Sequence, residues 1–219
     1  MISVMIKEIL YEQVARIGKA LSSPKRLELV ELLSQGEKTV EKLAQETDMD
    51  VRLASAHLKT LREARLVMSR REGKFMHYRL SGSDVVTLWL NVREVAENHL
   101  AELRVALDQM ISAPDQLSTE TRETLLAKAR RGEVIVVDVR PETEFLAAHL
   151  PFARSIPLDE LEQRLMELPS DIPVIAYCRG PFCLMSDNAV SILRQHGFNA
   201  HKINDGVTQW HRHGLPLEN

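Results

Sequence analysis

The chain has 219 residues, of which 44% are hydrophobic and 27% charged, and its formal net charge at pH 7 is −3. That length and apolar content suffice for two domains, each with a core of its own. Two cysteines exclude a disulfide framework and suit a reducing cytosol, and no apolar segment approaches the roughly 18 residues of a membrane span, so we expect a cytoplasmic protein with no membrane partner.

The charge is distributed unevenly along the chain. Residues 51–80 carry eight basic and two acidic side chains, whereas residues 113–219 carry 11 basic and 15 acidic ones. A local excess of basic residues is typical of a nucleic-acid contact, even where the total charge is negative. A long helical pattern stops at Pro114, so we expect two domains, residues 1–112 and 113–219, with different partners.

The first domain is predicted to be mainly helical. Five helices and one β-hairpin are expected, over residues 2–21, 24–34, 40–47, 51–64 and 83–111 for the helices and 69–80 for the hairpin. Ser22-Ser23-Pro24 and Asp50 stand where helix starts favour such residues. The apolar face of the 51–64 helix consists of Val51, Ala54, Leu58 and Leu61. Two helices joined by a tight turn and followed by a basic hairpin predict a winged helix-turn-helix.

The opposite face of the 51–64 helix is polar and is the predicted recognition surface. It carries, at positions i, i+3, i+4 and i+7, Arg52, Ser55, Ala56 and Lys59. We expect the first three near base edges and Lys59 near phosphates. The other expected phosphate contacts come from the same helix and the hairpin: Arg62, Arg70, Arg71, Lys74 and Arg79. Taken singly, each is more typical of a solvated surface; together with the helix order they predict binding to a double-stranded DNA operator.

Three segments of this domain resemble the ArsR family of bacterial repressors: LSSPKRL at 21–27, SAHLKTL at 55–61 and GKFMHYRL at 73–80. The resemblance covers residues 18–80 and implies a homodimer built from the first helix and the 83–111 helix. That last helix carries an extended apolar stripe of Val85, Leu88, Trp89, Val92, Val95, Leu100, Leu103 and Leu107. A core within the domain explains the same stripe, and we expect it to serve both roles.

Many ArsR relatives bind metals through cysteines on the recognition helices, or through Asp and His on the last helix. This chain has no cysteine before Cys178, and its last helix offers His99 without paired ligand spacing. His57 and His77 are therefore interpreted as polar or phosphate-contact residues. We expect no metal site and no cofactor.

The second domain alternates apolar strands with helical patterns. Val134–Val137 and Pro173–Tyr177 are continuous apolar runs, typical of strands that are buried on both faces. Helices are expected at about 118–131, 142–147, 158–167 and 185–195. This alternation predicts an α/β fold in which a parallel sheet is flanked by helices.

Both cysteines lie in one hexapeptide between the second strand and the helix after it: Cys178-Arg179-Gly180-Pro181-Phe182-Cys183. A strand that ends on a cysteine and turns into a helix presents backbone N–H groups and the positive helix end to the sulfur. We expect a thiolate at Cys178, surrounded by N–H groups from Arg179 to Leu184. The Arg179 side chain is a further candidate for stabilising it.

Residues 116–219 resemble the rhodanese domain, and an ArsR domain fused to a rhodanese domain is a known arrangement. The matching segments are VDVR at 137–140, EF at 144–145, HLP at 149–151, SIPL at 155–158, YC at 177–178, GF at 197–198 and DGVTQW at 205–210, with Ala148 in place of a usual glycine. The resemblance implies sulfur transfer, in which Cys178 takes the outer sulfur of a donor such as thiosulfate or a persulfide. Asp138 and Arg140 are expected to support the loop, most simply as an ion pair.

Loop length argues against oxyanion chemistry. Related phosphatases and arsenate reductases use a Cys-x5-Arg loop, whereas the residue six positions after Cys178 is Leu184. Cys183 stands where many simple sulfurtransferases carry another residue, and two interpretations stay open. It is either a small buried residue in the first turn of the helix or a resolving thiol that attacks a Cys178 persulfide.

Together the domains predict a DNA-binding transcriptional regulator, a repressor by its resemblance, whose rhodanese domain senses or processes reactive sulfur through a Cys178 persulfide. The alternative is a thiosulfate or persulfide sulfurtransferase in which the winged helix mainly dimerises. Sequence-specific DNA binding that responds to a sulfur donor discriminates between them.

Overall fold

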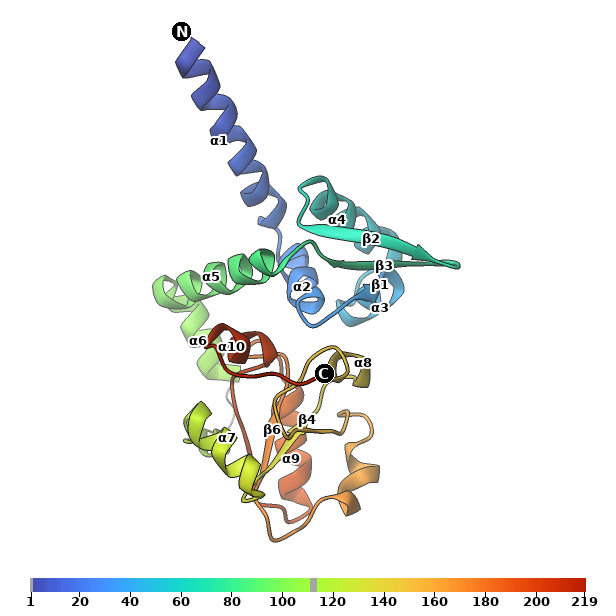
Figure 1. The fold of residues 1–219 in the computed structure, drawn as a ribbon, viewed down its shortest axis with the longest axis vertical. Helices are drawn as coiled ribbons and strands as arrows, with labels where there is room; N and C mark the ends of the chain where they lie inside the picture. Colours follow the sequence, from blue (N-terminus) through green and yellow to red (C-terminus); the bar gives the residue numbers. More distant parts are fainter. Residues whose placement is uncertain (1, 111–113) are drawn as a thin grey trace. The chain divides into compact units, whose positions relative to one another are not determined.

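The computed structural model describes residues 2–110 and 114–219, and the chain divides into two compact units, up to Arg93 and from Glu94 onward (Figure 1). The expected boundary between residues 112 and 113 lies outside the described residues. Among the described helices, none is both long enough and apolar enough to cross a membrane.

The first unit is a winged helix-turn-helix. Its elements in chain order are α1 (Ile2–Leu21), α2 (Pro24–Leu33), β1 (Lys38–Thr39), α3 (Val40–Glu46), α4 (Val51–Glu63), β2 (Val67–Glu72) and β3 (Phe75–Leu80), followed by α5 (Ser83–His99), which continues past the division at Arg93. The strands pair antiparallel in the order β1-β3-β2. Pairing of Glu72 with Phe75 leaves Gly73 and Lys74 as the hairpin turn, and Gly73 has a φ of 57°, which a glycine adopts without strain.

Helix α4 begins where its sequence predicts. The carboxylate of Asp50 accepts the backbone N–H of Arg52 at 2.8 Å, which caps the first turn. Ala54, Leu58 and Leu61 are fully buried, as their helical spacing requires. Val51 does not join them: its side chain is 42% exposed, because it is the first residue of the helix and follows the exposed Asp50.

The long helix expected over 83–111 is interrupted, so that prediction is wrong. Leu100 separates α5 from α6 (Ala101–Met110), and residue 111 lies outside the described part of the chain. The N–H of Leu100 still donates to the carbonyl of Ala96 at 2.8 Å, so the last turn of α5 is closed before α6 begins. Of the expected stripe, Val85 and Trp89 are buried, whereas Val95 and Leu100 are exposed.

The second unit is built on a parallel sheet. After α6 its elements are the 3₁₀ turn η1 (Pro114–Gln116), α7 (Arg122–Arg131), β4 (Ile135–Asp138), α8 (Glu142–Phe145), β5 (Arg154–Ser155), the 3₁₀ helix η2 (Leu161–Glu167), β6 (Val174–Tyr177), α9 (Met185–Gln195), β7 (Ala200–Lys202) and α10 (Val207–Arg212). The strand order is β5-β4-β6-β7, and every pair is parallel. Helix α7 begins later than expected, since the hydroxyl of Thr121 caps it by accepting the N–H of Thr124 at 3.2 Å. The segment expected as a helix over 158–167 is instead the 3₁₀ helix η2.

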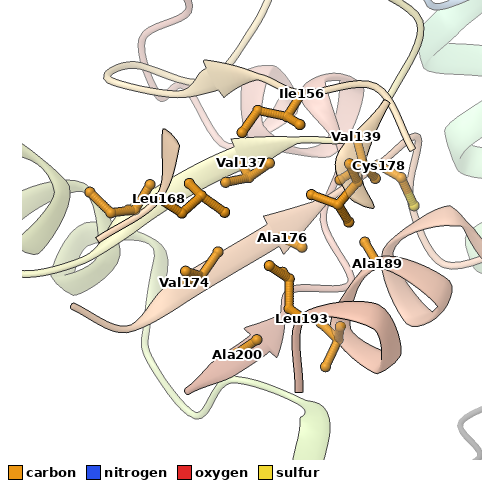
Figure 2. Close-up of a cluster of buried hydrophobic side chains, with 13 residues drawn as sticks. Val137, Val139, Ile156, Leu168, Val174, Ala176, Cys178, Ala189, Leu193 and Ala200 are labelled. Carbon is orange, nitrogen blue, oxygen red and sulfur yellow. The ribbon is translucent and has the colours of Figure 1, made fainter. Parts of the chain in front are cut away.

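The pleat of the two central strands sends alternate side chains into two cores. Val137 and Ala176 point to the core that η2 and α9 cover, and Figure 2 shows them in the same cluster as Leu193 of α9. The neighbouring residues Val136 and Tyr177 point the other way, into the core that α7 and α10 cover. Because both faces of the sheet are buried, these strands need no polar alternation, which is why they appear in the sequence as continuous apolar runs.

Candidate functional site

Cys178 follows the last residue of β6 and continues the alternation of that strand. Its side chain therefore faces the core under α9, where Figure 2 shows it at the end of the cluster, near Val139 and Ala189. Only 1% of its surface is exposed. The reacting atom predicted from the sequence is thus a buried sulfur at the carboxyl end of a parallel strand, where binding sites of α/β folds are generally formed.

The polar groups around this sulfur come from the loop and the first turn of α9. Sγ of Cys178 lies 3.3 Å from Oγ of Ser186, 3.4 Å from the carbonyl oxygen of Cys183 and 4.0 Å from that of Gly180. The largest influence on its pKa is a hydrogen bond from the Cys183 thiol, followed by the opposing effect of burial and then by hydrogen bonds from Ser186 and from backbone groups of Gly180 and Ser186. Their balance lowers the pKa of Cys178 to about 6, so the sulfur is a thiolate at neutral pH.

The pKa values of Cys183 and Cys178 depend on each other. It is partly buried and packs against the same apolar cluster as Cys178. Its hydrogen bond to Cys178, followed by burial, raises the pKa of the Cys183 thiol well above its usual range. The pair therefore holds one proton at neutral pH, on Cys183, and one negative charge, on Cys178.

The loop itself is a tight turn. The N–H of Cys183 donates to the carbonyl of Gly180 at 3.1 Å, so within the expected run of N–H groups this one is used to close the turn. Gly180 has a φ of 134°, and a Cβ there would lie 3.1 Å from the amide of Gln209. Pro181, Phe182 and Leu184 form the outer side of the turn, and Leu184 is the most exposed of them. The φ of residue 180 is one that only glycine adopts without strain.

The loop rests on the start of α10. A Cβ on Gly206 would lie 2.7 Å from the carbonyl oxygen of Cys178 and closer still to that of Arg179, so only glycine fits. Oε1 of Gln209 accepts the N–H of Gly206 at 2.8 Å. Nε2 and Oε1 of Gln209 both lie 3.1 Å from the position of a Cβ on Gly180, and Nε2 has no hydrogen-bond partner among the described residues.

Arg179 does not face the thiolate. Its guanidinium pairs with the carboxylate of Glu144, with Nε 3.0 Å from Oε2 and Nη2 2.5 Å from Oε1. The Glu144 side chain is 2% exposed. The interpretation of Arg179 as a group that stabilises the thiolate is therefore replaced by another: it neutralises a buried carboxylate and ties the loop to α8.

Asp138 and Arg140 form a buried ion pair at the end of the neighbouring strand. Nη2 of Arg140 lies 2.6 Å from Oδ2 of Asp138 and donates to the carbonyl of Ala148 at 2.8 Å. The hydroxyl of Tyr177 donates to the same Oδ2 at 2.5 Å, which connects the pair to the residue before Cys178. The φ of Ala148 is not positive, so its turn accommodates alanine in place of the usual glycine. Both charged side chains are 0% exposed, so they do not touch a solvent-borne substrate.

The predicted recognition residues share the outer side of α4. Arg52, Ala56 and Lys59 are exposed and Ser55 is half-buried. Lys59 lies 3.9 Å from Glu63, a solvated pair that leaves its charge largely available. Arg62 donates to the hydroxyl of Ser69 at 3.3 Å and so connects α4 to the hairpin.

The basic residues of the hairpin differ from one another. Arg70 is held by two carboxylates, with Nε 2.8 Å from Oε1 of Glu37 and Nη1 2.5 Å from Oε2 of Glu72. Among the described residues, Arg71 donates to a neutral group, the carbonyl of Gly73 at 3.0 Å, and Lys74 lies over the Phe75 ring. The exposed Arg79 donates to the Leu80 carbonyl at 3.3 Å. Arg70 is therefore a weaker candidate for a phosphate contact than Arg71 or Lys74.

Three residues of the site were missed by sequence reasoning. Ser186 carried a usable signal, since it is a hydroxyl in the first turn of the helix after the cysteine loop. Glu144 and Gln209 stood in segments that match the rhodanese domain, but nothing in the sequence connected them with the loop, because their partners are distant along the chain and only the fold brings them together. Within residues 2–110 and 114–219, no three His, Cys, Asp or Glu side chains gather closely enough to hold a metal ion.

Comparisons with known proteins agree with the two units. A rhodanese-like domain profile matches residues 121–213, and the profile of the bacterial regulatory protein arsR family matches residues 23–69. The chain is 43% identical over 212 residues to the HTH-type transcriptional regulator Rv0324 of Mycobacterium tuberculosis, which covers 97% of this chain and 93% of that one. It is 30% identical over 104 residues to a sulfurtransferase of Allochromatium vinosum, which covers 47% of this chain and 94% of that one.

Solved structures are similar to the first unit. One of them is the winged helix-turn-helix DNA-binding domain of Mb0332 from Mycobacterium bovis, 46% identical with a TM-score of 0.42, covering 44% of this chain and 89% of that one. The family assignment depends on the match to Rv0324, which extends through both units. The chain is a transcriptional regulator of the ArsR family that carries a C-terminal rhodanese domain.

Proposed function

We propose that this regulator binds its operator as a homodimer and that its rhodanese domain senses reactive sulfur by forming a persulfide on Cys178. The observation that carries the proposal is the thiolate of Cys178, held at neutral pH by a thiol, a hydroxyl and backbone groups at the junction of β6 and α9. A thiolate is the form of cysteine that attacks sulfur.

In the proposed step, the Cys178 thiolate attacks the outer sulfur of a small donor. A new bond joins Sγ to that sulfur, and the donor's own bond to it breaks, so that thiosulfate leaves as sulfite and a persulfide leaves as a thiolate. Since Cys178 is almost fully buried, the loop has to open to admit the donor. The outer residues of the turn, Pro181, Phe182 and Leu184, are those that would move.

The DNA-binding half of the proposal rests on the face of α4 and on the hairpin. Arg52, Ser55 and Ala56 would approach base edges. The phosphate contacts would come from Lys59 and Arg62 on α4 and, in the hairpin, from Arg71, Lys74 and Arg79, with a smaller part for Arg70. A homodimer is supported by the exposed apolar side chains of α1, which a second copy would cover: Met5, Ile6, Ile9, Leu10, Tyr11 and Val14.

The test combines mass spectrometry of the treated chain, which detects sulfur added to it, with a measurement of its affinity for DNA. The reduced chain is treated separately with thiosulfate and with glutathione persulfide, and the affinity for the DNA upstream of its gene is measured by fluorescence anisotropy. We expect a donor to change the affinity of the wild type and to leave that of Cys178→Ser unchanged. Equal responses of the two chains would contradict sulfur sensing through Cys178.

A sulfurtransferase that uses the winged helix mainly to dimerise is the second candidate. The similarity to a sulfurtransferase and the reactive setting of Cys178 support it. It predicts multiple turnovers with an acceptor thiol and no sequence-specific DNA complex under any condition. A specific complex that responds to the donor would favour the regulator.

A further inference from the structure

The loop brings its second cysteine back to its first. The turn closed by the Cys183 N–H and the Gly180 carbonyl places the Cys183 carbonyl oxygen 3.4 Å from Sγ of Cys178. The Cys183 side chain packs against the same apolar cluster and hydrogen-bonds to the Cys178 sulfur. The two sulfurs are therefore neighbours before any donor arrives.

The Cys178 thiolate is the main reason why Cys183 keeps its proton. The hydrogen bond to Cys178 is the largest cause that raises the pKa of Cys183 and burial is the second, while backbone groups of Met185 and Arg179 act in the opposite direction. When Sγ of Cys178 forms a bond to a second sulfur, the negative charge leaves Sγ and the first cause disappears. The pKa of the Cys183 thiol then falls, although burial still opposes its ionisation.

We propose that Cys183 resolves the Cys178 persulfide: its sulfur attacks Sγ of Cys178, forms an intraloop disulfide and expels hydrosulfide. The inference rests on the persulfide of the proposed function and adds a second activity, the conversion of sulfane sulfur to sulfide. Access favours Sγ as the point of attack, because the backbone carbonyl of Cys183 lies 3.4 Å from that atom and the Cys183 thiol is its hydrogen-bond partner.

The step balances without an outside oxidant. The bond between the two cysteine sulfurs forms while the bond between Sγ and the sulfane sulfur breaks, and hydrosulfide leaves with the electron pair of that bond and the proton of Cys183. The two thiols lose two electrons and the sulfane sulfur gains them. A low-molecular-weight thiol would return the loop to its reduced form by thiol–disulfide exchange.

Digestion with trypsin allows each cysteine to be analysed separately, because trypsin cuts after Arg179, between Cys178 and Cys183. Cys178 falls in peptide 165–179 and Cys183 in peptide 180–194. The reduced full-length chain is treated anaerobically with thiosulfate or glutathione persulfide, alkylated and digested. We expect the two peptides joined by a disulfide in the wild type, and with thiosulfate about one sulfide per chain.

The control is Cys183→Ser, which keeps a hydrogen-bond donor beside Cys178 but cannot form the disulfide. We expect this variant to retain one added sulfur on peptide 165–179 and to release at least about tenfold less sulfide. Cys183→Ala serves as a second variant, and a non-reducing gel distinguishes a link within one chain from a link between two chains.

The outcomes separate the two proposals. If Cys183→Ser carries the added sulfur but the wild type carries it too, with Cys183 alkylated, the resolving role is wrong and the persulfide stands. A link between two chains also overturns the resolving role. If neither chain gains sulfur or forms a disulfide, the proposed function fails, and the inference fails with it.

Discussion

The carbonyl oxygen of Cys183 lies 3.4 Å from Sγ of Cys178, so the loop after β6 returns to the residue at which it begins. Because the loop closes in this way, Cys183 keeps its proton while Cys178 loses its own. Reactivity at Cys178 therefore depends on Cys183 even before any sulfur is transferred.

The first prediction concerns the titration of Cys178. Its pKa is depressed to about 6, so its thiolate is present above that pH and disappears as the pH falls through it. Alkylation of Cys178 by iodoacetamide should be half-maximal near this value. In Cys183→Ala the midpoint should rise by about 1 unit or more, because the largest stabilising contact is lost. Cys183→Ser should shift it less, since a hydroxyl still donates, and equal shifts would show that the contact is not the cause.

The second prediction tests the support under the loop. Gly206→Ala places a methyl group against the carbonyls of Cys178 and Arg179, which we expect to cost about 1–3 kcal/mol of unfolding free energy. Urea denaturation measures this, and iodoacetamide titration should show a raised Cys178 pKa. Gly18→Ala is the control, since nothing lies within 4 Å of a Cβ there and alanine favours helix α1. A Gly206→Ala chain as stable as the control would contradict the close packing.

The third prediction concerns Arg179. Arg179→Ala removes the guanidinium that neutralises the buried carboxylate of Glu144, and we expect a loss of about 3–5 kcal/mol of unfolding free energy. Arg131→Ala removes an arginine from a well-exposed pair with Glu133 and should cost less than about 1 kcal/mol. Because the Arg179 side chain faces Glu144, the Cys178 pKa should stay low in whatever fraction of the variant folds. A large rise of that pKa would restore Arg179 as a group that stabilises the thiolate.

The fourth prediction sorts the basic residues of the hairpin. Arg71→Ala and Lys74→Ala should each weaken operator binding and reduce the salt dependence of the affinity by about one phosphate contact. Arg70→Ala should have a smaller effect, because Glu37 and Glu72 already neutralise its guanidinium. Anisotropy titrations at several salt concentrations measure both quantities. If Arg70→Ala lost as much, Arg70 would have to exchange its carboxylates for phosphate on binding.

The fifth prediction concerns self-association through α1. Leu10→Glu and Val14→Glu place charges on its exposed apolar side chains, and we expect them to convert a dimer to a monomer in light scattering. The exposed Glu12→Gln on the same helix is the control and should leave the molar mass unchanged. A wild-type chain that is monomeric at micromolar concentration would contradict the homodimer.

The sequence by itself determined the two folds. Alternating and continuous apolar runs reflect how many faces of a strand are buried, and helical spacing on α4 separates Leu58 from Lys59; both are local regularities that a chain shows directly. The cysteine loop was equally visible, because its position between a strand and a helix is local. The break at Leu100 was not predicted, and the expected long helix is two helices, α5 and α6.

The tertiary structure alone decided the partners of the charged and polar side chains. Arg179 meets Glu144, 35 residues away, Arg70 meets Glu37, 33 residues away, and Gly180 meets Gln209 on another helix. An ion pair or a close packing contact leaves no periodic trace in a sequence, since its two members come together only when the elements carrying them pack. The surroundings of the Cys178 sulfur were also decided by the fold. The pleat of β6 turns this side chain into the core, and the first turn of α9 places the hydroxyl of Ser186 beside it.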